Sequence, residues 1–194
     1  MGAKLDRRTV LGAALLLVGC GGAPGGQRAP GAPESPLRLA VGEIVPGDGP
    51  PPLPAANFID ERRSRELAEQ LRARLASRLV PAGGPAVLRV ELDQVALTER
   101  LIEGRVGGVG GLVRREPTFA QEGALAVRLR VIEPGGREAA QVRVAVQRSR
   151  ALPAGASVVT RDEAARALAA DLLAQLDDAL EVAVRDQLGP WLSG

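Results

Sequence analysis

Alternation of apolar and polar residues predicts strands along the chain. In "LRLAVGEIV" (37–45), Leu37, Leu39 and Val41 alternate with polar or small residues. The segment "AVLRVELDQVALTE" (86–99) alternates in the same way from its third residue onward. A period of two is that of a strand with one buried face, so each segment is expected to be a strand.

A hairpin over 124–150 is the strongest strand signal, because the alternation occurs there twice. Between the two runs, "EPGGR" supplies the proline and glycines of a tight reversal. Arg128, Arg130 and Arg143 are expected to share the solvent side. The apolar residues of the opposite side are Leu125, Val127, Leu129, Val131, Val142, Val144 and Val146.

Leucines at intervals of four predict a first helix after residue 57. They are Leu67, Leu71, Leu75 and Leu79, and charged residues lie elsewhere on the helical wheel. Asn57 or Asp60 can cap this helix, because a side-chain oxygen there accepts from a free backbone amide. The sequence "PAGGP" (81–85) is expected to end it.

A second, longer helix is predicted near the C-terminus. Thr160 and Glu163 have the S/T-x-x-E spacing of a capping box, and Gly189 followed by Pro190 ends the helix. Its apolar stripe consists of Ala165, Leu168, Leu172, Leu176, Ala179 and Ala183, widened by Leu173, Leu180 and Val184. The element order is thus strand, helix, three strands, helix.

That order predicts an α+β two-layer sandwich. About four mainly antiparallel strands would form the sheet, and two amphipathic helices would cover one of its faces. Residues 37–194 have the usual size of one domain, and we expect a single α+β domain there.

The first 19 residues have the pattern of a secretory signal peptide. Lys4, Arg7 and Arg8 precede an apolar run that is about half the ~20 residues needed to span a bilayer. The run ends in "LVGC" (17–20), which resembles the bacterial lipobox. An ordinary signal peptide with an incidental cysteine and a buried core cysteine are the alternatives.

The lipobox resemblance implies that Cys20 becomes an acylated mature N-terminus. Gly21 follows it where aspartate would favour the inner membrane, which implies an outer-membrane destination. Residues 20–36 then form a lipidated N-terminus and a Gly/Pro/Ala-rich linker. The pair of arginines in "DRRTVLG" leaves the Sec and twin-arginine export routes both open.

Charge and composition exclude several functional classes. Removal of the first 19 residues leaves 22 of 25 basic and 22 of 23 acidic residues, so we expect no nucleic-acid partner. The chain has no histidine and one cysteine, which removes the usual catalytic triads and imidazole metal ligands. Glu91 and Asp93 are expected on an exposed strand face, and Asp177 and Asp178 on the polar side of a helix. No cofactor, metal or catalytic residue is predicted.

The Gly-rich segment 104–119 is a candidate for binding. Its glycine amides and arginines could hold a phosphate, but the P-loop spacing is absent, and Val113 stands where a dinucleotide-binding pattern needs glycine. A β-β connection is the simpler interpretation, while Val106, Val109, Leu112 and Val113 would suit a partner or lipid. The candidate residues are Gly107, Gly108, Val109, Gly110, Gly111, Leu112, Arg114 and Arg115.

Several stretches resemble an uncharacterised group of Gram-negative outer-membrane lipoproteins. They are the lipobox, "GLVRREPTFAQEGALAVRLRVIEPGGRE", "RSRALPAGASVVTRDEA" and a C-terminal helix ending near Trp191. More distantly, the element order is similar to auxiliary lipoproteins of ABC-type transport and to the lipoprotein of the lipopolysaccharide translocon. No binding residue is carried over from these families.

These observations together predict a non-enzymatic outer-membrane lipoprotein that faces the periplasm. It would act as an accessory in envelope assembly or intermembrane lipid transport by binding a membrane protein partner. Membrane lipid would be held through the acylated Cys20. A lipoprotein that binds a small lipidic or anionic ligand is the main alternative, and an enzyme that uses carboxylates is a third.

Overall fold

A computed structural model describes residues 35–47, 58–106 and 114–193 of the chain. Its two long helices are α1 (Phe58–Arg78) and α2 (Val158–Gln187), and a short 3-10 turn η1 (Gly189–Trp191) follows. The strands are β1 (Leu37–Leu39), β2 (Glu43–Pro46), β3 (Leu79–Pro81), β4 (Val87–Val106), β5 (Arg114–Ile132) and β6 (Glu138–Pro153). The predicted signal peptide, linker and Cys20 lie outside the described residues.

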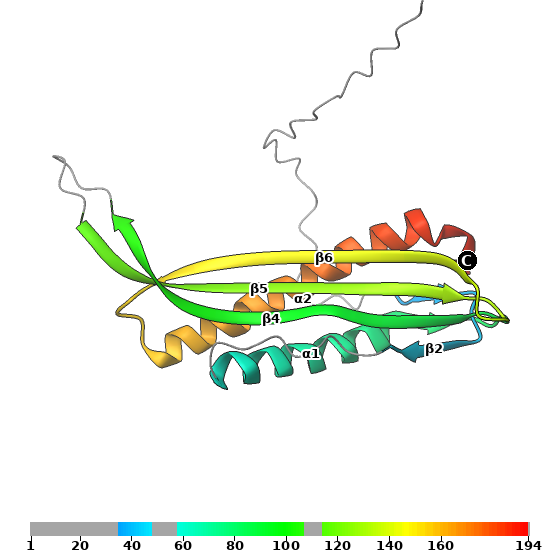
Figure 1. Cartoon of the computed structure of the whole chain (residues 1–194), viewed down its shortest axis with the longest axis horizontal. Coiled ribbons are helices and arrows are strands. Elements are labelled where there is room, and N and C mark those ends of the chain that lie inside the picture. Colours follow the sequence, from blue (N-terminus) through cyan, green and yellow to red (C-terminus); the bar gives the residue numbers. More distant parts are fainter. Residues whose placement is uncertain (1–34, 48–57, 107–113, 194) are drawn as a thin grey trace, which may run out of the picture. The chain divides into compact units, whose positions relative to one another are not determined.

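The main sheet has the order β2-β4-β5-β6, and both helices pack on one face of it (Figure 1). β5 is antiparallel to both β4 and β6, whereas β2 runs parallel to β4. Helix α1 packs on β4, and α2 packs on β5 and β6. The predicted α+β class, with two helices on a four-stranded sheet, is confirmed.

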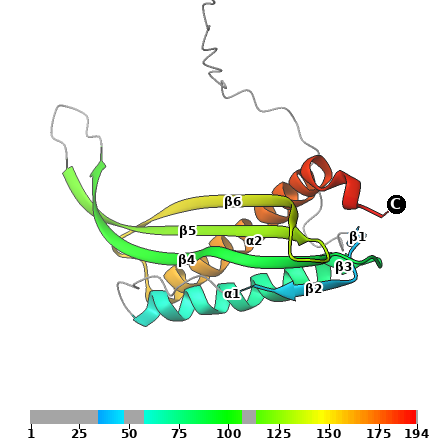
Figure 2. The ribbon, with the colours of Figure 1, turned by 45° about the vertical axis from the view of Figure 1, so that its right-hand side comes forward.

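The predicted first strand, 37–45, is in fact two short strands in different sheets. β1 pairs in parallel with β3, which follows α1 directly, and β2 crosses to the main sheet (Figure 2). At the crossing, a Cβ on Gly42 would lie 2.5 Å from the carbonyl oxygen of Gly84. Leu37, Leu39 and Val41 are buried as predicted, because a strand and its continuation around a turn can keep the same alternation.

The bounds of α1 differ from the prediction at both ends. Leu79 is buried but belongs to β3, so the helix ends before "PAGGP". Asp60 lies within the first turn and binds a strand amide, described below, rather than capping the helix. The alternative cap, Asn57, lies outside the described residues. The leucines at 67, 71 and 75 face the core, as their spacing predicts.

A bulge in β4 explains a change of phase in its sequence. The pairing with β5 shifts between Leu92 and Gln94, so no residue of β5 lies opposite Asp93 in the backbone register. Before the bulge Leu88 and Leu92 are buried, and after it the buried positions are Val95 and Leu97. One extra residue restores the apolar face toward the helices, since a shift of one position turns every side chain over.

The β4 and β5 ladder is longer than the alternation predicts. It continues to the pair of Val106 with Arg114, so much of the expected 104–119 connection is strand. Residues 107–113 are outside the described part of the chain. Alternation fails here because Leu101 and Ile102 are successive residues and both are exposed. When both faces of a strand pair are exposed to solvent, apolar and polar residues need not alternate along the strands.

The second predicted hairpin strand and helix are confirmed with one correction. Gly135 and Gly136 have positive φ in the turn between β5 and β6, as a tight reversal requires. Helix α2 is capped by Ser157, whose Oγ accepts from the Thr160 amide at 3.1 Å, rather than by Thr160 and Glu163. Its C-terminal end is as predicted, and Leu192 then bridges to Leu39 of β1.

Sheet and helix approach each other closely at Gly123 of β5. A Cβ there would lie 2.3 Å from Cδ1 of Leu172, whose side chain is fully buried. We expect Gly123→Ala to lower the free energy of unfolding by about 1–3 kcal/mol through overpacking. The control is Gly155→Ala, which meets no atom within 4 Å. Equal midpoints of urea unfolding for the two variants would contradict this packing.

Candidate functional site at the helix starts

The sequence-predicted binding residues fall in two places. Cys20 and residues 107–112 lie outside the described residues. Arg114 and Arg115 are the first residues of β5, opposite Val106 and Arg105. The ladder therefore places Arg105 and Arg115 directly across from each other at the far end of the β4 and β5 ribbon.

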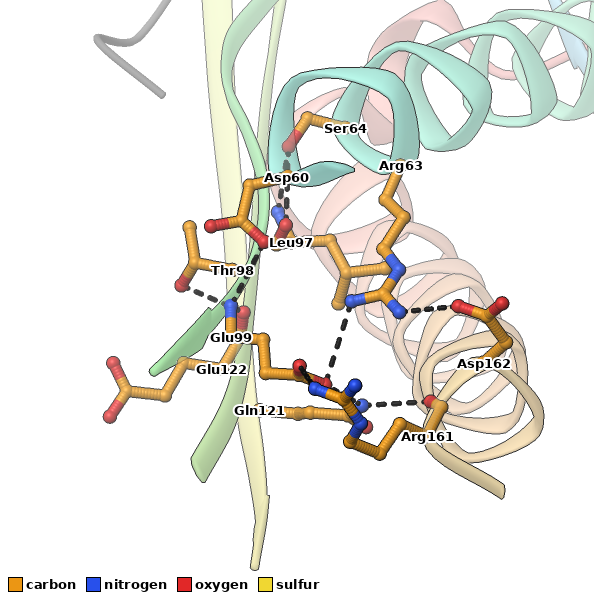
Figure 3. Close-up of polar contacts among 10 residues, drawn as sticks. All are labelled: Asp60, Arg63, Ser64, Leu97, Thr98, Glu99, Gln121, Glu122, Arg161 and Asp162. Carbon is orange, nitrogen blue, oxygen red and sulfur yellow. Dashed lines mark hydrogen bonds and ion pairs between the residues drawn. The ribbon is translucent and has the colours of Figure 1, made fainter. Parts of the chain in front are cut away.

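A polar network beneath the start of both helices was missed by the sequence analysis. Its centre is Glu99 of β4, whose carboxylate accepts from Arg161 of α2 at 2.6 Å and from Gln121 of β5 at 2.7 Å (Figure 3). Arg63 of α1 lies 3.6 Å from the same carboxylate. One side chain thus joins two strands and two helices.

Further contacts close this network. Gln121 is 0% exposed and also donates to the backbone carbonyl of Arg161 at 2.8 Å. Arg63 donates to Asp162, one residue further along α2. The guanidinium of Arg161 stacks over Phe119 at 4.4 Å from the ring centroid, a cation–π contact. The start of α2 is therefore held by its backbone and by two side chains.

Helix α1 also satisfies the open edge of β4. The neighbouring strand β2 pairs with β4 only up to Val90. Further along, the amide of Leu97 donates to Ser64 Oγ at 3.0 Å, and the amide of Glu99 donates to Asp60 Oδ1 at 3.1 Å. Four residues of helix rise about 6 Å and two of strand about 6.8 Å, so the two periods match.

Ion pairs continue along the interface of the two helices. Arg63, Arg74 and Arg78 of α1 pair with Asp162, Asp177 and Glu181 of α2. The residue numbers rise together, so the helices run in parallel and begin at the same end (Figures 1 and 2). Asp177 is only 2% exposed, so its predicted place on a solvated helix face is wrong. Its partner, Arg74, is 103 residues away in sequence.

On the other face of the sheet, the predicted solvent-side arginines form a second set of ion pairs. Arg128 and Arg143 both donate to Asp93 at 2.8 Å, and Arg130 donates to Glu91 at 3.0 Å. Burial alone would raise the pKa of Asp93, but the hydrogen bonds from the two arginines outweigh it and lower that pKa. These carboxylates therefore balance guanidinium charge.

Exposed apolar side chains gather on the segments that the network joins. They are Ile59 at the start of α1, Leu101 and Ile102 of β4, and Val158 and Val159 at the start of α2. Each lies one to three residues from Asp60, Glu99 or Arg161. Successive residues of a strand point to opposite faces, so Leu101 lies on the helix side with Leu97 and Glu99, whereas Ile102 lies on the other side. We call Ile59, Leu101, Val158 and Val159 the helix-start surface. Among the described residues, the other large apolar side chain with comparable exposure is Val182, far along α2.

Two kinds of feature are absent from the described residues. None of their helices is both long and apolar enough to cross a membrane. Their acidic side chains do not form a group of three or more that could bind a metal ion.

The fold is similar to that of several lipoproteins of Gram-negative bacteria. The minor lipoprotein of Acinetobacter baumannii is 12% identical, with 80% of this chain and 98% of that chain covered, at a TM-score of 0.41. For rare lipoprotein B of Shewanella oneidensis the identity is 15%, the coverage 77% and 94%, and the TM-score 0.36. An uncharacterized lipoprotein B of Nitrosomonas europaea is 13% identical, with 78% of this chain and 88% of that chain covered, at a TM-score of 0.39. No family model and no curated protein matches the sequence.

The network predicts that Glu99 matters far more than its neighbour Glu122. Glu99→Ala would leave Arg63 and Arg161 without their shared carboxylate in a largely buried setting. Loss of one partner of a buried ion pair costs about 3–5 kcal/mol. Glu122 pairs with Arg100 where both side chains are about half exposed, so Glu122→Ala should cost less than about 1 kcal/mol. Chemical denaturation of both variants measures the difference, and similar losses would argue against the network.

Proposed function

We propose that this protein is a non-enzymatic accessory lipoprotein of the outer membrane that faces the periplasm. It would bind a membrane protein partner through the helix-start surface and serve envelope assembly or intermembrane lipid transport. The observation that carries the proposal is the presence of four exposed apolar side chains, those of the helix-start surface, on segments fixed by one buried network. The lipobox at residues 17–20 supports the anchor.

Rigidity of this surface supports binding rather than chance exposure. Apolar side chains in water favour association, because covering them removes apolar area from solvent. Leu101 is 61% exposed and Val159 is 66% exposed. The segments that carry them are joined by hydrogen bonds to Glu99, so less conformational entropy is lost on docking. The carboxylates of Glu99 and Asp162 near the surface are used in ion pairs with Arg161 and Arg63, which supports the non-enzymatic assignment.

A small-ligand function is the second candidate, and one feature of the ladder favours it. Arg105 lies directly opposite Arg115, and Arg114 follows next along the ribbon. These arginine positions belong to the Gly-rich segment that the sequence analysis identified as a candidate for binding. Native mass spectrometry of protein purified from membranes separates the two functions. A retained lipid or anion would favour the ligand-binding function, whereas co-purification with an integral membrane complex would favour the partner-binding one.

The anchor predicts incorporation of labelled palmitate in cells. Wild-type protein should take up the label and fractionate with outer membranes, because several acyl chains hold a protein firmly to a bilayer. Cys20→Ser should lose both properties, since the substituted residue cannot form the thioether. A soluble and unlabelled wild type would refute the lipoprotein assignment.

The partner surface predicts a specific loss in cross-linking experiments. The double variant Leu101→Ser with Val159→Ser should reduce recovery of a cross-linked integral membrane protein from intact cells at least several-fold. The matched control is Val182→Ser, because Val182 is 69% exposed on the same helix as Val159 but far from its start. Circular dichroism confirms that each variant is folded. Equal recovery from the double variant and the control would exclude this surface.

A further inference from the structure

The interface of α1 and α2 is open between two of its ion pairs. Arg63 with Asp162 closes one end, and three turns later Arg74 with Asp177 closes the other. Near Asp162, the buried residues that α2 contributes to the lining are Ala165 and Ala169, whose side chains are single methyl groups. These leave a cleft of about 420 Å³, within the range of small-molecule sites. It is lined by Arg62, Arg63, Glu66, Leu67, Gln70, Leu97, Asp162, Ala165, Arg166 and Ala169.

The cleft has an apolar floor and a charged rim. Leu67, Leu97, Ala165 and Ala169 are buried residues at its base, whereas Arg62 and Arg166 are exposed. An apolar floor below a charged rim suits a ligand that has both a charged and an apolar part. Gln70, also exposed on α1, adds a neutral hydrogen-bonding group to the lining.

The arginines of the rim differ in how their charge is balanced. Arg63 has Asp162 and Glu99 as partners. Arg62 lies 3.8 Å from Glu66, and both side chains are more than half exposed, so this pair contributes little. Arg166 makes no ion pair or side-chain hydrogen bond with another residue in the described part of the chain. Two guanidinium groups are thus available to an incoming anion.

The arginines around the cleft make the electrostatic potential positive at Asp162, which lines the cleft together with the carboxylate of Glu66. The pKa of Asp162 is lowered, first by the hydrogen bond from Arg63 and then by the charges of Arg63, Arg166 and Arg62. All three arginines therefore lower the pKa of the same carboxyl group. Asp162 therefore stays ionised at a pH at which an ordinary aspartate is protonated, and its carboxylate keeps the guanidinium of Arg63 in place.

From this geometry we propose that the cleft between α1 and α2 binds a phosphate ester. Its phosphate would bind Arg62 and Arg166, because the planar guanidinium group matches phosphate oxygens with two parallel hydrogen bonds. An apolar part of the ligand would rest on Leu67, Leu97, Ala165 and Ala169. The site is separate from the helix-start surface and from Arg105 and Arg115 of the ribbon, so it does not depend on the partner or ligand functions proposed above.

Isothermal titration of the mature chain with two probes tests this site. The probes are inorganic phosphate and dihexanoyl phosphatidylglycerol kept below its micelle concentration. Arg166→Gln should weaken binding about tenfold or more, the loss expected for a charge-assisted hydrogen bond. The control is Arg89→Gln, since Arg89 is also exposed and makes no ion pair or side-chain hydrogen bond with another described residue, but lies outside the cleft.

A third variant, Ala169→Leu, fills the apolar floor without changing charge. It should weaken binding of the phosphatidylglycerol more than that of phosphate, because only the lipid needs the floor. Lipid binding at least tenfold tighter than phosphate would assign the ligand to a lipid headgroup, and equal affinities would assign it to a soluble phosphate compound. Absence of binding for both probes, or equal losses in Arg166→Gln and Arg89→Gln, would overturn the proposal.

Discussion

The edge of β4 beyond its pairing with β2, as far as the described residues show it, is the constraint on which the rest of the domain depends. A long strand with open backbone groups invites pairing with other chains, and β2 covers only the first part of it. Farther along the strand, Ser64 and Asp60 of helix α1 accept hydrogen bonds from backbone amides of β4. These contacts fix both the height and the rotation of α1 on the sheet. Every other interhelical contact follows from that placement.

Once α1 is placed, its arginines determine where α2 can lie. Buried ion pairs add little net stability, because the desolvation of two charges offsets most of their attraction. A misplaced α2 would instead leave Arg63 or Arg78 without a partner in a buried setting, and that is costly. The ion pairs therefore select one register of two leucine-rich helices that could otherwise slide. Glu99 extends the same selection to the sheet, because it accepts from α2 and lies against α1.

The sequence alone predicts what repeats with a short period. The leucines at intervals of four and the alternation around Val127 and Val144 indicate their elements because each pattern has one buried face. The sequence did not predict the split after Leu39 or the bulge at Asp93. The apolar residues stay buried across both features, although the split moves them to a different strand and the bulge changes which positions of β4 face the core. The network was invisible for a different reason. Arg63 and Asp162 are 99 residues apart, and nothing near either residue in sequence indicates its partner.

Arg63 also connects the two surfaces to which function is assigned. One side of its guanidinium faces Glu99, beneath the helix-start surface, and the other faces Asp162 in the wall of the cleft. A ligand in the cleft that attracts Arg63 would weaken its hold on Glu99, and a partner that shifts the start of α2 would move Asp162. Such coupling is reciprocal, because each event changes the free energy of the other by the same amount. A single guanidinium shared by two carboxylates is therefore enough to make binding at one site sensitive to the other.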